Sequence, residues 1–282
     1  MADSHPEHLH RAHQYHDERQ QFDAGKLGIW LFLLTEVLFF SGLFCAYAVY
    51  RASHPEIFYY AHHFLDTRLG ALNTCILLLS SLTAAMSVRE AQLGHPKKLS
   101  LYIALTLICS CAFLCVKYVE YSHKFQDGLL PGTHFNPTEH VWETPTFRRQ
   151  HPEAARFAED FRAFAANGKA EDAKRRERFM HPTRLEIEPL IHAGVLGPNA
   201  EYPAFPSQPR NAHQFFGLYF ALTGLHGIHV LGGIAVWGWL LLRARRGEFG
   251  PKYFGPVDYA ALYWHLVDLI WIYLFPLLYL IH

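Results

Sequence analysis

The chain has 282 residues, of which 51% are hydrophobic and 18% charged. A soluble protein usually carries about a quarter charged residues, so this deficit predicts a membrane protein. The 25 basic and 25 acidic residues balance to zero, without a basic block, which argues against nucleic-acid binding. All five cysteines fall in apolar segments and form no CxxC pair, so we expect small, buried membrane residues rather than a disulfide framework.

Five apolar stretches are long enough to cross a bilayer as helices, which takes about 20 residues. They cover residues 27–50, 69–88, 99–121, 215–242 and 257–281. Backbone groups in lipid must be satisfied within the segment, and the many alternating strands of a barrel are absent. The sequence therefore predicts an all-α fold, a polytopic membrane bundle of five transmembrane helices.

The stretches outside these helices divide the chain into four parts. We expect a cytoplasmic histidine-rich tail at 1–25, helices one to three within 26–123, a polar insert at 124–212, and helices four and five within 213–282. The tail either is simply solvated or holds a transition metal, although its histidine spacing fits no regular tetrahedral pattern.

The insert is polar and is expected to be partly helical. Residues 152–166 have the features of a short amphipathic helix, and residues 169–179 could form a second one. Two such helices could cover the outer face of the bundle or dock a partner.

The distribution of Lys and Arg predicts the orientation in the membrane. With a cytoplasmic N-terminus, the outer loop between helices one and two carries only Arg51 and Arg68. The inner segments then carry ten such residues: Arg11, Arg19, Lys26, Arg89, Lys97, Lys98, Arg243, Arg245, Arg246 and Lys252. We therefore expect the N-terminus in the cytoplasm and the insert and C-terminus on the extracytoplasmic side.

Five ionisable residues fall near the middle of the predicted helices, where each charge costs at least about 2.5–3.5 kcal/mol and needs a partner. They are Glu36 in the first helix, His226 and His229 in the fourth, and His265 and Asp268 in the fifth. By residue count, all but His226 lie within roughly 6 Å of one another in height. We therefore expect the first, fourth and fifth helices to close around a polar cluster.

Three roles for this cluster stay open. It could be a structural hydrogen-bond network, with Glu36 neutral or sharing a proton with a histidine. It could be a proton relay, because a buried carboxyl group beside imidazoles can exchange protons. It could also hold a metal, although no HxxxH or ExxH spacing concentrates ligands on one helix. The sequence shows no nucleotide-binding loop or nucleophile triad, so we expect no catalytic centre and no metal.

Other residues predict contacts between helices. Lys117 and Glu120, toward the outer end of the third helix, are spaced to pair. Trp30 and Tyr279 suit the aromatic belts at the membrane surface. The fourth helix carries glycines that allow close helix approach, and the second carries groups able to bond across helices: Gly224, Gly227, Gly232, Gly233, Asn73, Thr74, Ser80, Ser81 and Thr83.

Four motifs resemble cytochrome c oxidase subunit III. They are LLTEVLFFSGLF at 33–44, LNTCILLLSSLT at 72–83, FALTGLHGIHVLGG at 220–233 and YWHLVDLIWIYLF at 263–275, with Glu120-Tyr121 between the second and third. The resemblance covers all five helices in order. The chain is similar to the five-helix bacterial form, except that the insert at 124–212 replaces a short connection.

This resemblance implies a subunit that binds no haem or copper, because those groups lie on partner subunits. Such a subunit packs against the catalytic subunit I and other oxidase subunits, stabilises subunit I during turnover and supports proton uptake. Glu36 matches the family's buried glutamate. Structural phospholipids are expected in a cleft between the first two helices and the other three. Arg243 matches a family arginine associated with lipid headgroups, and we assign His226 to lipid binding as well.

The implied function is that of a non-catalytic subunit of a proton-pumping oxidase in a bacterial plasma membrane, which transfers electrons from cytochrome c to oxygen. The insert would then contact an extracytoplasmic cytochrome c or a larger respiratory assembly. Alternatives within the family are a quinol oxidase subunit and an accessory subunit of nitric oxide reductase. Alternatives outside it are a stand-alone proton-coupled transporter using Glu36 and Asp268, and a pure assembly factor.

Overall fold

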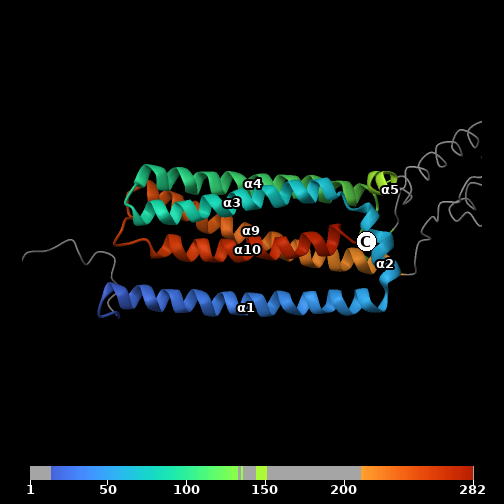
Figure 1. Cartoon of the computed structure of the whole chain (residues 1–282), viewed down its shortest axis with the longest axis horizontal. Helices are drawn as coiled ribbons and strands as arrows, with labels where there is room; N and C mark the ends of the chain where they lie inside the picture. Colours follow the sequence, from blue (N-terminus) through green and yellow to red (C-terminus); the bar gives the residue numbers. More distant parts are fainter. Residues whose placement is uncertain (1–13, 133–134, 136–143, 151–210, 282) are drawn as a thin grey trace, which may run out of the picture. The chain divides into compact units, whose positions relative to one another are not determined.

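The computed structural model describes residues 14–132, 135, 144–150 and 211–281, and within these residues the regular structure is helical (Figure 1). Five helices are long and apolar enough to cross a membrane: α1 (Glu18–Ser53), α3 (Thr67–Gln92), α4 (Pro96–Gln126), α9 (His213–Arg245) and α10 (Gly255–Tyr279). Three short helices accompany them: α2 (Pro55–Ala61), η2 (His62–Phe64) and α5 (Pro145–Gln150). The all-α fold with five spans is confirmed, whereas the helices expected at 152–166 and 169–179 lie outside the described residues.

Each long helix begins before the apolar run that identifies it, and all but α10, which ends at Tyr279, also continue past the end of that run. Helix α1 begins at Glu18, inside the stretch expected as a tail, because residue 17 caps it: the backbone N–H of Gln20 donates to the Asp17 carboxylate. Helix α4 begins at Pro96, a favourable first-turn residue. The turn before it uses Gly94 at φ +73°, a conformation that other residues adopt at a cost.

The described residues fall into two units. The larger unit takes its residues from Met1–Ala48, Ala71–Val119 and Phe220–Phe275. The smaller unit takes its residues from Val49–Gly70, Glu120–Tyr219 and Pro276–His282. The larger unit therefore contains most of every spanning helix, and the smaller unit contains one end of each of the five together with α2, η2 and α5.

Within the larger unit, α1 contacts its neighbours along a narrow stripe. Its three buried residues are Leu33, Phe40 and Tyr47, which follow one another at intervals of seven residues. Two turns of helix separate such residues, so they share one face. Most of the other apolar side chains of α1 are exposed, including Leu27 at 63% and Trp30 at 56%.

Helix α10 is instead buried on several sides and carries two of the unit's largest fully buried side chains, Trp264 and Trp271. It is joined to α3 by three side-chain hydrogen bonds: Trp264 to Ser80, Trp271 to Thr74, and Ser81 with His265. In Figure 1, α10 runs between α1 and the α3–α4 pair. Because these bonds join α3 to α10, the second spanning helix packs with the later ones. The lipid cleft that the family resemblance implied, between the first two spanning helices and the other three, stays a prediction.

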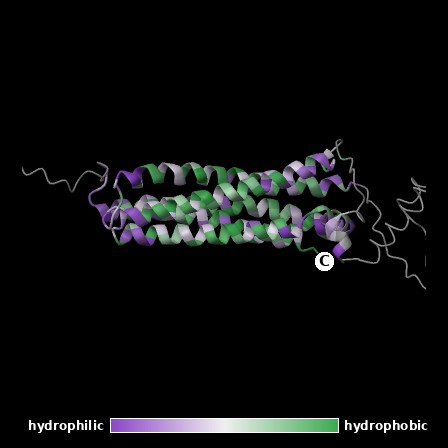
Figure 2. Cartoon of the chain, turned by 90° about the horizontal axis from the view of Figure 1, so that it is seen from above, coloured by the Kyte–Doolittle hydropathy of each residue, from purple (hydrophilic) through white to green (hydrophobic). Residues whose placement is uncertain are grey.

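The middle of the spanning helices is predominantly hydrophobic and their ends are polar (Figure 2). Exposed leucine, isoleucine and valine side chains lie on all five helices, as expected for surfaces that face lipid. The cysteines belong to these surfaces: Cys45, Cys75, Cys111 and Cys115 are exposed, and Cys109 is intermediate. The prediction that they are buried was wrong, because apolar composition alone does not tell a lipid-facing position from a core position.

Candidate functional site

Glu36 and His229 form a direct contact between α1 and α9. The Nε2 atom of His229 lies 2.8 Å from the Oε2 atom of Glu36. The Phe40 ring, one turn along α1 from Glu36, packs edge-on against the same imidazole at 5.2 Å. The Tyr263 hydroxyl of α10 donates to the backbone carbonyl of His229 at 2.9 Å. Three helices thus fix this histidine, as the predicted polar cluster required of α1, α9 and α10.

The second ring nitrogen of His229 restricts how the pair can be protonated. Its Nδ1 lies 2.8 Å from the backbone carbonyl of Leu225, which can only accept, so Nδ1 carries a hydrogen. The Glu36–His229 contact then contains one proton, held either by the carboxyl group or by Nε2. The first arrangement is a neutral pair and the second an ion pair. The neutral pair avoids the cost of charge in an apolar surrounding.

His265 meets a different partner, Ser81 of α3, and Asp268 does not join the Glu36–His229 contact. The Ser81 hydroxyl lies 2.6 Å from Nδ1 of His265. Neither carboxyl oxygen of Asp268 has a hydrogen-bond partner within the described part of the chain. Helix α3 therefore supplies the polar partner on this side, which the expected cluster of three helices did not include.

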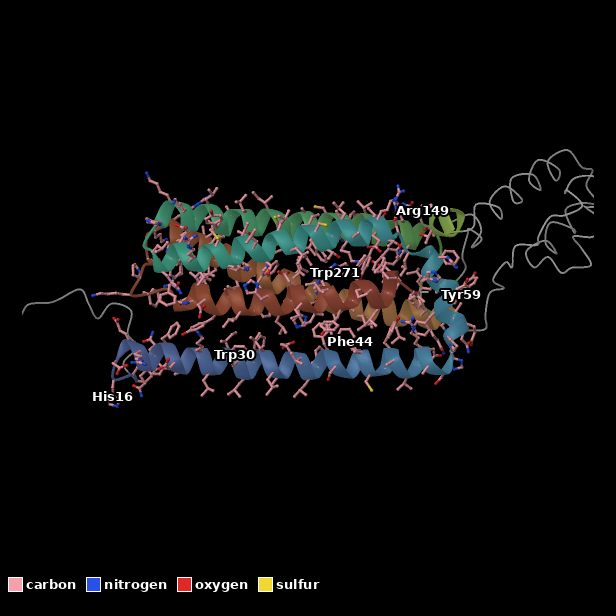
Figure 3. The ribbon with its side chains drawn as sticks, in the orientation of Figure 1. His16, Trp30, Phe44, Tyr59, Arg149 and Trp271 are labelled. Atoms are coloured by element: carbon pink, nitrogen blue, oxygen red, sulfur yellow. The ribbon has the colours of Figure 1, made fainter. Side chains whose placement is uncertain are left out.

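His226 lies in an aromatic setting between α4, α9 and α10. Its ring packs against Phe113 at 5.6 Å and Trp271 at 5.3 Å, and it is 0% exposed. The Lys117 ammonium lies 4.7 Å from the centroid of the same Trp271 ring, a cation–π distance. Figure 3 labels Trp271, whose side chain these contacts place toward α4 and α9. Complete burial argues against the lipid contact that the sequence assigned to His226.

Arg243, near the end of α9, is held by groups of the following loop. Its Nε donates to Glu248 at 2.6 Å and an Nη atom donates to the Tyr253 hydroxyl at 3.4 Å. The guanidinium carbon also lies 4.6 Å from the ring centroid of Trp239 and 5.1 Å from that of Phe249. A phosphate reaching Arg243 would therefore compete with Glu248 for its N–H donors.

The smaller unit contains a buried polar group centred on Glu120. One oxygen of Glu120 accepts hydrogen bonds from Tyr219 and Tyr279, and the Lys124 ammonium lies 3.6 Å from it. Lys124 also donates to the carbonyl of Phe64 at 3.4 Å. These contacts join the end of α4, the start of α9, the end of α10 and η2. They give a buried carboxylate the partners that its burial requires.

Sequence reasoning missed most of this second group. The pairing of Lys117 with Glu120 stays a prediction, whereas the i,i+4 spacing of Glu120 and Lys124 was the better signal. Tyr279 was expected in an aromatic belt, but it is 3% exposed and bonded to Glu120. Trp30 is 56% exposed, in keeping with a belt position.

Comparison with known proteins gives matches over both the end and the bulk of the chain. A sequence model of the family described as "Cytochrome c oxidase subunit III" matches residues 207–282, which contain α9 and α10. The chain is 22% identical over 255 residues to the "Probable cytochrome c oxidase subunit 3" of Nocardia farcinica, a match that covers 90% of this chain and 87% of that relative.

Two further relatives differ in their names. The chain is 21% identical over 265 residues to the "Cytochrome bo(3) ubiquinol oxidase subunit 3" of Pseudomonas putida, covering 92% of this chain and 88% of the relative. It is 41% identical over 68 residues to the "Cytochrome c oxidase subunit 3" of Thermostichus vulcanus, covering 24% and 34%. The long matches extend over about nine tenths of the chain and share the designation subunit 3.

Proposed function

The chain belongs to the cytochrome c oxidase subunit III family, and we propose that it is the non-catalytic subunit of a proton-pumping terminal oxidase. It is a multi-pass membrane protein and a subunit of a haem-copper oxidase complex. In the proposal it stabilises the catalytic subunit I, binds phospholipid and supports proton uptake. Haem and copper, with the redox chemistry they supply, belong to partner subunits.

The observation that carries the stabilising role is the Glu36–His229 contact. It joins α1 to α9 at a distance of 2.8 Å, next to the stripe that contains Phe40. An isolated polar side chain in lipid is costly, so the pair is satisfied only when α1 lies in this position. The contact therefore supports a stabilising role, in which polar groups fix the positions of the helices that pack against the catalytic subunit.

The same pair supports a part in proton uptake. One proton lies between Glu36 and His229, whose Oε2 and Nε2 atoms are 2.8 Å apart. Its transfer from the oxygen to the nitrogen changes a neutral pair into an ion pair. No other group has to move for that change. A pair of this kind can take a proton from one side and return it, which is the chemistry a relay needs.

Arg243 supports the lipid role. Its guanidinium lies near the end of a spanning helix, among aromatic rings that suit the membrane boundary. Bidentate geometry favours a phosphate diester, for which Glu248 is the internal competitor. In the proposed orientation, this end faces the cytoplasm of a bacterial plasma membrane, and the insert lies outside.

We propose cytochrome c as the electron donor of the complex. The second candidate is a quinol oxidase, favoured by the match to the Pseudomonas putida relative named ubiquinol oxidase subunit 3. The donor site lies on other chains in either case, so the activity of the purified complex has to separate them.

The test is gentle purification of the complex through a tag on this full-length chain. We expect a subunit I carrying haem and copper to co-purify, and the complex to oxidise reduced cytochrome c. Oxidation of a quinol instead would select the second candidate. Haem or copper retained by this chain after subunit I is removed, or purification without any oxidase subunit, would contradict the proposal.

A further inference from the structure

A pocket of about 430 Å³ lies between the N-terminal end of α1 and the start of α10, on the same unit. These two helix ends run side by side in Figure 1, and the Tyr259 hydroxyl of α10 donates to the Phe22 carbonyl of α1 at 2.8 Å. A side chain at Gly25 would meet the Tyr259 ring, so glycine permits this close approach. The pocket belongs to neither the Glu36 pair nor the Glu120 group.

Aromatic rings form the fixed part of the pocket. Phe22 packs against Phe254 at 5.4 Å and against Tyr259 at 5.8 Å between ring centroids. Tyr253 also lines it. Because these rings hold one another, the pocket is largely formed before anything binds, which lowers the entropy cost of binding.

The charged groups that line the pocket are two cations and one carboxylate: Arg19, Lys252 and Glu18. Lys26, which lies nearby on α1, is instead paired with Asp258 at 3.6 Å. Asp17 and Asp23 share a neighbouring shallow surface with Arg19 but do not line the pocket. The pocket itself therefore has a formal excess of one positive charge.

The position of the pocket along α1 fixes its level in the membrane. It ends at Gly25, and the exposed apolar surface of the helix begins with Leu27 and Trp30. Cations and aromatic rings directly before an apolar stretch are typical of the boundary between headgroups and acyl chains. A ligand here can place a polar head in the pocket and apolar chains along α1.

We propose that this pocket binds the phosphodiester headgroup of a membrane phospholipid, with Arg19 and Lys252 as the phosphate-binding residues. A phosphodiester carries a single negative charge, which matches the excess of one positive charge. Free phosphate and nucleotides carry more negative charge and would be repelled by Glu18. Free phosphate and nucleotides have no apolar chains that could cover the exposed apolar surface beyond Gly25, whereas a phospholipid has acyl chains that fit it. Arg243 does not line this pocket; it bonds Glu248 and reaches only the hydroxyl of the lining residue Tyr253.

The test uses the full-length chain, purified with its accompanying subunits and reconstituted in nanodiscs with a photoreactive phospholipid. The crosslinked peptides are mapped by mass spectrometry. The wild-type protein should be labelled within residues 15–25 and 252–259, and the R19Q/K252Q variant should lose about tenfold in this labelling. The matched control is K97Q/K98Q, which removes two exposed charges at the start of α4.

Competition experiments on the wild-type protein identify the ligand without any substitution. Unlabelled phospholipid should displace the probe, whereas diacylglycerol, which lacks the phosphate, should not. Equal labelling of R19Q/K252Q and the control would overturn the site. Displacement by millimolar inorganic phosphate as effective as that by phospholipid would overturn the lipid as its ligand.

Discussion

Helices α1 and α10 belong to the same unit and both cross the membrane, yet they are held in different ways. Helix α10 buries two tryptophans and forms three side-chain hydrogen bonds with α3. Helix α1 buries three residues along one stripe and meets α9 through the Glu36–His229 pair. Lipid supplies no hydrophobic drive between helices, so packing and polar contacts decide position. The comparison indicates that packing fixes α10, whereas a few polar contacts place α1.

The largest effect should come from the packing of α10. Trp271→Ala removes a fully buried indole that contacts Phe113, His226 and Thr74, and we expect a loss of about 3 kcal/mol in the free energy of unfolding. Trp30→Ala, at a position 56% exposed on α1, is the control and should change stability little. Unfolding in mixed micelles measures both. Equal losses would remove the distinction between the two helices.

Close approach between α9 and α10 should have the next largest effect. A methyl group at Gly233 would overlap the indole ring of Trp264, which is fully buried, so Gly233→Ala should cost about 1–3 kcal/mol. A methyl group at Gly227 on the same helix would meet no atom within 4 Å. Gly227→Ala should therefore leave the apparent melting temperature unchanged or slightly raised. A melting temperature lowered equally by both variants would refute steric overlap as the cause.

The polar contact of α1 should matter less for stability. Glu36→Ala removes the bond to His229 and should cost about 1 kcal/mol. Glu36→Gln tests the neutral pair, because an amide N–H can still donate to Nε2, and it should retain most of the stability. If Gln is as harmful as Ala, the pair is ionised rather than neutral. In the intact complex, both variants should leave haem spectra unchanged and slow proton uptake.

The smallest effect should come from a single hydroxyl of α3. Ser81→Ala removes the partner of His265, and we expect a cost of about 0.6 kcal/mol. Ser41 on α1 bonds only the Leu38 carbonyl of its own helix among the contacts described, so Ser41→Ala serves as the control. A cost for Ser81→Ala above that of Glu36→Ala would reverse the ranking of the two contacts. Unfolding in mixed micelles again provides the measurement.

Most of the fold could be predicted because hydropathy identifies a spanning helix directly. All five spans are present. The second spanning helix forms hydrogen bonds to other helices, as expected, through Thr74, Ser80, Ser81 and Thr83. The helix starts were harder. Residues 18–25 of α1 continue the helix with Phe22 as their one large apolar residue, so this polar stretch was interpreted as part of the tail.

The site could be predicted only in part, because the depth of a residue in the membrane does not tell which neighbouring helix its side chain faces. Glu36 and His229 were expected at similar heights, and they meet. Asp268 and His265 were expected to face the same cluster, but His265 bonds Ser81 of α3, and the Asp268 oxygens have no hydrogen-bond partner among the described residues. Lys124 and Tyr279 lie near helix ends, where polar side chains can be exposed to water. The i,i+4 spacing of Lys124 from Glu120 was therefore the one sequence feature that indicated their burial around Glu120.

The seven-residue spacing of Leu33, Phe40 and Tyr47 limits how α1 can change during evolution. Its lipid-facing positions can exchange one apolar residue for another at little cost. A single inserted residue after Phe40 would rotate everything beyond it by about 100° around the helix axis. Tyr47 would then turn toward the acyl chains and an unfitted neighbour would take its place. We therefore expect natural variants of this helix to differ freely in composition but to conserve the number of residues between its three anchors.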